Sequence, residues 1–121
     1  MFGKGQGGVQ DKAEAIRWYR LAADHGHAAA QFNLGAMFYH GEGVAQDHAE
    51  AVRLYRLAAA QGNADAQFNL GLMFKNGKGV AQDTAEAIRW YRLAAEQGNQ
   101  VAQERLNALL SESRKRARPG A

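Results

Sequence analysis

Apolar positions along this chain recur at the three- and four-residue spacing of an amphipathic helix. At 100° per residue, Ala30 and Leu34 fall on one side of one such segment. Trp18 and Tyr19 fall on one side of another. Val, Ile and Thr are scarce, which argues against a sheet. The pattern predicts an all-α fold with helices at 12–25, 28–40, 48–61, 64–76, 84–97 and 100–113.

Two kinds of helix alternate because the chain repeats itself every 36 residues. Asp11, Asp47 and Asp83 stand 36 residues apart and open the related phrases DKAEAIRWYRLAADHG, DHAEAVRLYRLAAAQG and DTAEAIRWYRLAAEQG. Segments 11–46 and 47–82 are identical at 25 of 36 positions. A fixed period in this range is typical of solenoids, in which each unit buries its apolar face against its neighbours. We therefore expect a solenoid of helix pairs.

The ends of the predicted helices carry recognisable signals. Each repeated Asp is followed three residues later by a Glu, which predicts a capping box in which the Glu side chain reaches back. Gly26, Gly62 and Gly98 stand where a left-handed cap ends a helix at least cost. Gly35 and Gly71 instead lie mid-helix, where glycine costs about 1 kcal/mol relative to alanine. We expect that the missing side chain lets the paired helix come close.

The repeats predict one domain over residues 1–113 and a basic, disordered tail over residues 114–121. The opening phrase MFGKGQGGVQD is similar to MFYHGEGVAQD at 37–47. The domain is therefore expected to begin with half a repeat, followed by repeats from positions 11, 47 and 83. In the last helix, Glu104 and Asn107 replace the Phe and Gly of the earlier copies, as a capping repeat requires.

Composition narrows the classes of function. The chain has no cysteine, which excludes disulfides, thiolate catalysis and Cys-ligated metal sites. The formal net charge of +3 comes from the tail, because residues 1–113 hold 11 Lys and Arg against 12 Asp and Glu. No stretch approaches the roughly 18 apolar residues of a membrane span. The first ten residues lack the apolar core of a signal peptide, so cytoplasm and periplasm both remain open.

The repeated phrase A-x-x-x-L-G-x-M-F-x-x-G-x-G-V-x-x-D-x-x-x-A-x-x-W-Y-R-x-A-A-x-x-G resembles the Sel-1-like repeat, a relative of the tetratricopeptide repeat, over residues 1–112. Leu54 departs from it, because the pattern has Trp there. The resemblance implies a right-handed superhelix of antiparallel helix pairs. It also implies a non-enzymatic adaptor or scaffold, often in bacterial signalling, envelope biogenesis or host contact. Some cysteine-rich relatives bind or hydrolyse β-lactams, and this chain differs from that branch in having no Cys.

Differences between the copies point to a ligand surface. Within the 28–40 helix and its copy, the variable positions fall on the side opposite the apolar stripe. In the related family this helix lines the concave groove. Phe32 and Phe68 lie on the variable side and suit an extended peptide or a partner helix as anchors; the alternative is that both complete the core. The predicted partner-binding residues are Phe32, Ala36, Tyr39, His40, Asp65, Phe68, Leu72, Lys75 and Asn76.

Other chemically suggestive residues are expected to be structural. Arg17 and Arg20, with their copies, are expected on a solvated face beside partners such as Glu14. The four His residues have no third ligand at a recurring spacing, so no metal site is predicted. No catalytic residue or cofactor is predicted either. Four aromatic residues could stack bases, but their helical spacing favours the core: Trp18, Tyr19, Trp90 and Tyr91.

The two ends of the chain predict different partners. The 12–25 helix is expected to expose an apolar side and to mediate self-association. The basic tail could touch nucleic acid, but four charges without interleaved aromatics favour a solubilising role. Three alternatives to a groove-binding scaffold stay open. They are a β-lactam-processing enzyme, an anionic-polymer binder, and a structural segment of a longer repeat array. The enzyme is disfavoured, because Cys is missing and Thr84, Ser111 and Ser113 do not readily provide a nucleophile with a nearby base.

Overall fold

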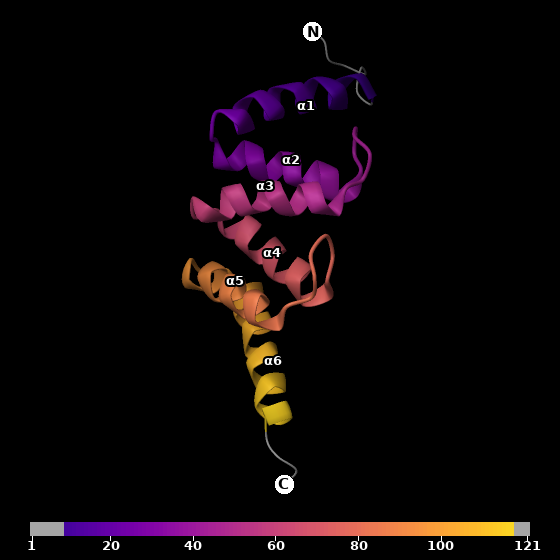
Figure 1. The fold of residues 1–121 in the computed structure, drawn as a ribbon. Coiled ribbons are helices and arrows are strands. Elements are labelled where there is room, and N and C mark those ends of the chain that lie inside the picture. Colours follow the sequence, from indigo (N-terminus) through magenta and orange to yellow (C-terminus); the bar gives the residue numbers. More distant parts are fainter. Residues whose placement is uncertain (1–8, 118–121) are drawn as a thin grey trace.

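The computed structural model describes residues 9–117 and shows six α-helices stacked along one axis (Figure 1). No strand occurs in this range. The α1 helix lies at one end of the stack and α6 at the other (Figure 1). The predicted all-α repeat fold is therefore confirmed. The helices are α1 (Val9–Asp24), α2 (Ala28–His40), α3 (His48–Ala60), α4 (Ala64–Asn76), α5 (Thr84–Glu96) and α6 (Gln100–Ala117).

Both ends of the stack differ from the prediction. The α1 helix begins at Val9, so Asp11 lies inside the helix and is not its N-cap. The α6 helix continues to Ala117, so Arg114, Lys115 and Arg116 form its last turn where a disordered tail was expected. Arg and Lys are good helix formers, and cations are favourable at the negative end of a helix dipole. Most of the predicted opening half repeat and the last four tail residues lie outside the described range.

The first helices of the second and third repeats, α3 and α5, each have an Asp residue as their N-cap. The backbone N–H of Glu50 donates to Asp47 Oδ1 at 3.0 Å, and that of Glu86 donates to Asp83 Oδ1 at 3.1 Å. The predicted contact from each Glu side chain back to the N-cap is wrong, because the Glu carboxylate pairs instead with an Arg three residues further on. In α3, Arg53 donates to both oxygens of Glu50. An ion pair one turn along the helix therefore replaces the contact back to the N-cap.

The second helices have caps that the sequence reasoning missed. Asn63 accepts a hydrogen bond from the N–H of Ala66 at 2.9 Å, and Asn99 accepts one from that of Ala102 at 2.8 Å. His27 holds this position before α2 and makes no side-chain cap bond. The preceding glycines have positive φ angles of 88–96°, as the predicted left-handed caps require.

A tyrosine ring fills the space that each mid-helix glycine leaves. The ring of Tyr55 on α3 lies against Gly35 of α2, and that of Tyr91 on α5 lies against Gly71 of α4. A Cβ at Gly71 would stand 2.5 Å from the Tyr91 ring, and one at Gly35 would stand 2.9 Å from Tyr55. The predicted close approach is confirmed, although the approaching helix belongs to the following repeat. Accordingly, α2 packs most extensively on α3, and α4 on α5.

Buried glutamines connect the same pairs of repeats. Gln31 and Gln67 are each only 4% exposed. Gln31 donates to the carbonyl of Ala23, and Gln61 donates to Gln31 Oε1 at 2.8 Å. The same two bonds recur one repeat later, where Gln97 donates to Gln67 Oε1 at 2.9 Å. Because an unpaired buried amide costs about 1–3 kcal/mol, this ladder fixes the register between neighbouring repeats.

The four aromatic residues predicted for the core divide unequally. Trp90 and Tyr91 are buried, with exposures of 6% and 0%. Tyr19 is half-buried, whereas Trp18 is 62% exposed, so its core assignment is wrong. The reason lies in the stack: α4 covers the face of α5 that carries Trp90, and no described helix covers the same face of α1.

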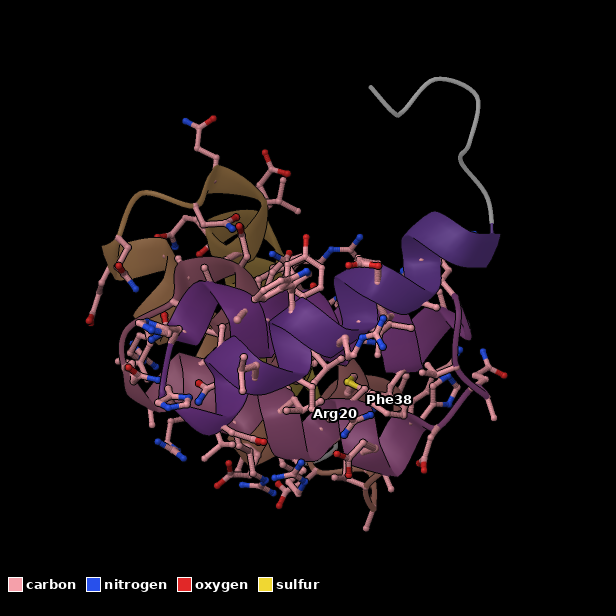
Figure 2. All side chains as sticks on the ribbon, turned by 90° about the horizontal axis from the view of Figure 1, so that it is seen from above. Arg20 and Phe38 are labelled. Atoms are coloured by element: carbon pink, nitrogen blue, oxygen red, sulfur yellow. The ribbon has the colours of Figure 1, made fainter. Side chains whose placement is uncertain are left out.

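The repeated arginines also divide into two groups. Arg17 pairs with Glu14 at 3.6 Å on an exposed face, as predicted. Arg20 instead places its guanidinium over the Phe38 ring at 5.8 Å, and Figure 2 shows the two side chains together. Arg56 repeats this contact over Phe74 at 5.3 Å. These cation–π contacts join the two helices of one repeat.

None of the helices between residues 9 and 117 combines the length and the apolar composition that a membrane span needs.

Replacing Gly71 by Ala tests the packing of tyrosine on glycine. Helix propensity alone would stabilise Gly71→Ala by about 1 kcal/mol. We expect net destabilisation of about 1–3 kcal/mol, because the new methyl group meets a buried ring at 2.5 Å. Urea denaturation of wild type and variant measures the difference. In a Tyr91→Leu background the same substitution should be neutral or stabilising; equal destabilisation in both backgrounds would show that the ring is not the cause.

Candidate peptide-binding groove

The nine residues predicted to bind a partner all lie on α2 and α4, the second helices of successive repeats. The structure brings only some of them together. Tyr39, His40 and Leu72 line one depression, and Lys75 lines the next one along the stack. Asp65 and Asn76 are exposed but line neither depression.

The first depression lies between α2, α3 and α4 and has a volume of about 210 Å³. Leu72 and Tyr39 line it with partly exposed side chains, whereas Met73 and Tyr55 are each only 2% exposed. Asn69 adds an amide that can both donate and accept a hydrogen bond. A mostly apolar hollow with a few convergent polar groups is the usual form of a site for a small ligand or a side chain. We call this hollow the Tyr39 depression.

Three residues of the Tyr39 depression were missed by the sequence reasoning. Tyr55, Asn69 and Met73 have the same residue type in the preceding repeat, as Tyr19, Asn33 and Met37. The argument from differences between copies could not find them. Tyr55 was missed for a second reason, because it lies on α3, whereas the second helices were expected to form the groove alone.

Phe32 and Phe68 act mainly as packing residues. Both are half-buried against the main core cluster. The ring centroid of Phe32 lies 5.6 Å from that of Tyr55, and Phe68 lies 5.7 Å from Tyr91. Each Phe therefore supports the tyrosine that fills the glycine position on the same helix. Neither Phe lines the Tyr39 depression.

Two imidazole rings and one ammonium group lie close to the ring of Tyr39. Its ring lies 5.0 Å from the ring of His40 and 4.7 Å from that of His48. The Lys78 ammonium stands 5.9 Å from the Tyr39 ring centroid. The Lys78 ammonium therefore places a positive charge beside the ring of Tyr39.

A second depression of about 180 Å³ continues the surface toward α6. It is more polar than the first and includes Lys75 and Arg116 beside Glu112. Thr84 and Ser113, two of the three hydroxyl residues considered for catalysis, also line it. Among the described residues, no three His, Asp or Glu side chains gather as a metal site would require.

Burial changes the acid–base behaviour of two tyrosines. Desolvation raises the pKa of Tyr55 above the ordinary value, and its interaction with Asn69 opposes this shift. Desolvation likewise raises the pKa of Tyr91. The Tyr91 hydroxyl is buried without a hydrogen-bond partner among the described residues. Both hydroxyls are therefore held in the neutral form over a wider pH range than an exposed phenol.

The helix pairs that pack most closely coincide with the units of a known family. The Sel1 repeat model matches residues 1–27, 28–63 and 64–99. The second match contains α2 and α3, and the third contains α4 and α5. The chain belongs to the Sel1 repeat family, whose repeats generally mediate protein–protein interaction.

Solved structures agree with this assignment. A Sel1 repeat protein from Oxalobacter formigenes is 40% identical with a TM-score of 0.76, and the match covers 78% of this chain and 39% of that one. A protective antigen of uropathogenic Escherichia coli strains that displays an SLR fold is 43% identical with a TM-score of 0.84, covering 90% and 23%. This chain thus spans less than half the length of either protein.

A more distant structure shares the fold alone. Cysteine-rich protein B of Helicobacter pylori is 22% identical with a TM-score of 0.75, and the match covers 78% of this chain and 71% of that one. No curated protein matches the sequence. Because this chain has no cysteine, the cysteine framework named in that relative has no counterpart here.

Alkaline pH should destabilise the protein through its buried tyrosines. Tyrosines of the unfolded chain ionise near pH 10, whereas Tyr55 and Tyr91 have raised pKa values in the fold. The unfolded state therefore loses protons first, and the free energy of unfolding should fall as pH rises past about 10. Urea denaturation at a series of pH values measures this. A Tyr55→Phe/Tyr91→Phe variant should show a smaller fall than wild type; parallel curves would contradict the assignment.

Proposed function

We propose that this protein is a non-enzymatic scaffold that binds an extended peptide segment of a partner protein across α2 and α4. The Tyr39 depression is the observation that carries this proposal. It accepts one apolar side chain against Leu72 and Met73 while the peptide backbone runs along the surface. Asn69 can satisfy a backbone amide group, which is the role that polar groups take in otherwise apolar sites.

The charges around the Tyr39 depression suggest the composition of the peptide. His40, His48 and Lys78 all stand close to the Tyr39 ring. Lys75 lies beyond, in the second depression. An acidic residue next to the anchoring side chain would be attracted by the ammonium groups of Lys78 and Lys75. The proposed ligand is therefore a segment with an apolar residue and a neighbouring Asp or Glu.

The proposal is tested with substitutions that place at each position a residue type already found at the same position of another repeat. Leu72→Ala places at this position the residue found at Ala36 and Ala108. Tyr39→Lys places there the residue found at Lys75. Peptides are first selected from a random display library on the immobilised wild-type protein. The double variant should bind the selected peptides about tenfold or more weakly, because it loses the apolar contacts of the hollow.

Fluorescence anisotropy with labelled peptides gives the affinities. The matched control is Leu57→Ala, which removes an aliphatic side chain that is 44% exposed and lines neither depression. Leu57→Ala should leave binding unchanged. If no peptide is enriched, or if the double variant binds as wild type does, the groove is not the ligand site and the segment acts as a spacer.

A further inference from the structure

The outer face of α1 is an apolar surface separate from the groove. Trp18 is 62% exposed and Leu21 is 53% exposed. Figure 2 looks down on this end of the stack, with α1 nearest the reader. Together with charged neighbours, the two residues line a shallow depression of about 360 Å³. Its lining residues are Glu14, Arg17, Trp18, Arg20, Leu21 and Asp24.

Part of this face is covered in the later repeats: the copies of Trp18 are buried, whereas Leu57, in the register of Leu21, stays 44% exposed. Leu54 on α3 and Trp90 on α5 occupy the register of Trp18, and they are 2% and 6% exposed. The helix that packs most extensively on α3 is α2, and the one that packs most extensively on α5 is α4. Tyr19 occupies the register of Tyr55 and Tyr91 but is only half-buried. The face of α1 therefore continues an interface that the chain builds twice.

The two covering helices show what this interface accepts. Each carries a glycine against the tyrosine ring, at Gly35 and Gly71. Each also carries a Phe whose ring packs on that tyrosine. Each also carries a buried Gln. Gln31 accepts a hydrogen bond from Gln61 of the following repeat, and Gln67 accepts one from Gln97. In α2 and α4 these residues form the common phrase Gln-Phe-Asn-Leu-Gly.

The polar end of the interface also has a counterpart on α1. His25 occupies the register of Gln61 and Gln97. Its Nδ1 lies 2.9 Å from the carbonyl oxygen of Leu21, a bond in which the ring nitrogen donates. The other ring nitrogen, Nε2, can share a hydrogen bond with the side-chain amide of an incoming Gln, which both donates and accepts. The face therefore carries apolar residues and a hydrogen-bonding side chain at the same repeat positions as α3 and α5.

A second copy of the chain does not supply the required helix. Its α2 and α4 already cover its own α3 and α5. Its last helix, α6, has Glu104 in the register of Phe32 and Asn107 in the register of Gly35. Asn107 would place a side chain where Tyr19 needs open space, and Glu104 would bring a carboxylate to an apolar surface. Head-to-tail stacking of copies is therefore disfavoured.

We propose that the outer face of α1 binds an amphipathic helix of a partner chain that presents Gln, Phe, Leu and Gly as α2 and α4 present them. This site is independent of the groove, because the depression on α1 shares no residue with the Tyr39 depression. Binding covers Trp18, as α2 and α4 cover Leu54 and Trp90, and seats the partner's glycine over Tyr19.

Trp18 fluorescence reports occupancy of this face. The chain has two tryptophans, and Trp90→Leu leaves Trp18 as the only one while placing at 90 the residue found at Leu54. Peptide 64–76 of this chain serves as the partner helix, and peptide 100–112 serves as its natural control. We expect the first peptide to shift Trp18 emission to shorter wavelength with saturation. The second peptide, and a Phe68→Glu/Gly71→Asn form of the first, should bind about tenfold or more weakly.

Short peptides are marginal helices in water, so a fusion provides a second measurement. A copy of residues 28–46 joined directly before Asp11 raises the effective concentration of the helix. The fusion should shift Trp18 emission and raise the thermal midpoint, whereas a fusion with Phe32→Glu and Gly35→Asn in the added copy should do neither. Identical behaviour of the two fusions would overturn the proposal. So would a wild-type dimer in sedimentation that Trp18→Glu dissociates, because a second copy would then be the occupant.

Discussion

The packing of a tyrosine ring against a glycine of the preceding helix is the contact on which the rest of the structure depends. Tyr55 on Gly35 and Tyr91 on Gly71 set the distance between successive repeats. Their register is then held by the hydrogen bonds between buried glutamines. The glycines lower the helix propensity of α2 and α4. The tyrosines restore stability, because a buried aromatic ring removes a large apolar area from water.

This arrangement determines which surfaces remain available. The second helices use one side to receive the following repeat and leave another side for the Tyr39 depression. The same geometry leaves the outer face of α1 open, whereas α6 ends the stack with Glu104 and Asn107. The two exposed surfaces therefore have different origins. The groove lies beside the stacking interface, and the α1 face is that interface without its covering helix.

Much of the fold could be predicted because repetition makes each signal appear more than once. The starts of the internal helices, the glycine caps and the close approach at Gly35 and Gly71 followed from local patterns. Trp18 was assigned wrongly because a residue pattern shows an apolar face but not whether a neighbour covers it. Arg20 is exposed, as predicted, but its contact with Phe38 could not be predicted, because Phe38 lies on the next helix.

The groove was predicted less completely than the fold. Differences between copies identified Tyr39, His40 and Leu72, which the structure brings to one depression. They also identified Asp65 and Asn76, which lie outside it. Tyr55 and Asn69 could not be found in this way, because a site that combines repeated and variable residues depends on three-dimensional contact.

Amide chemical shifts of the ¹⁵N-labelled protein, recorded while a selected peptide is added, test the central claim most directly. The account predicts that the largest changes occur around Tyr39, Asn69 and Leu72, with smaller changes toward Lys75 and no comparable change on the outer surface of α3 and α5. Changes concentrated on that outer surface, with α2 and α4 unaffected, would contradict the assignment of ligand binding to the groove.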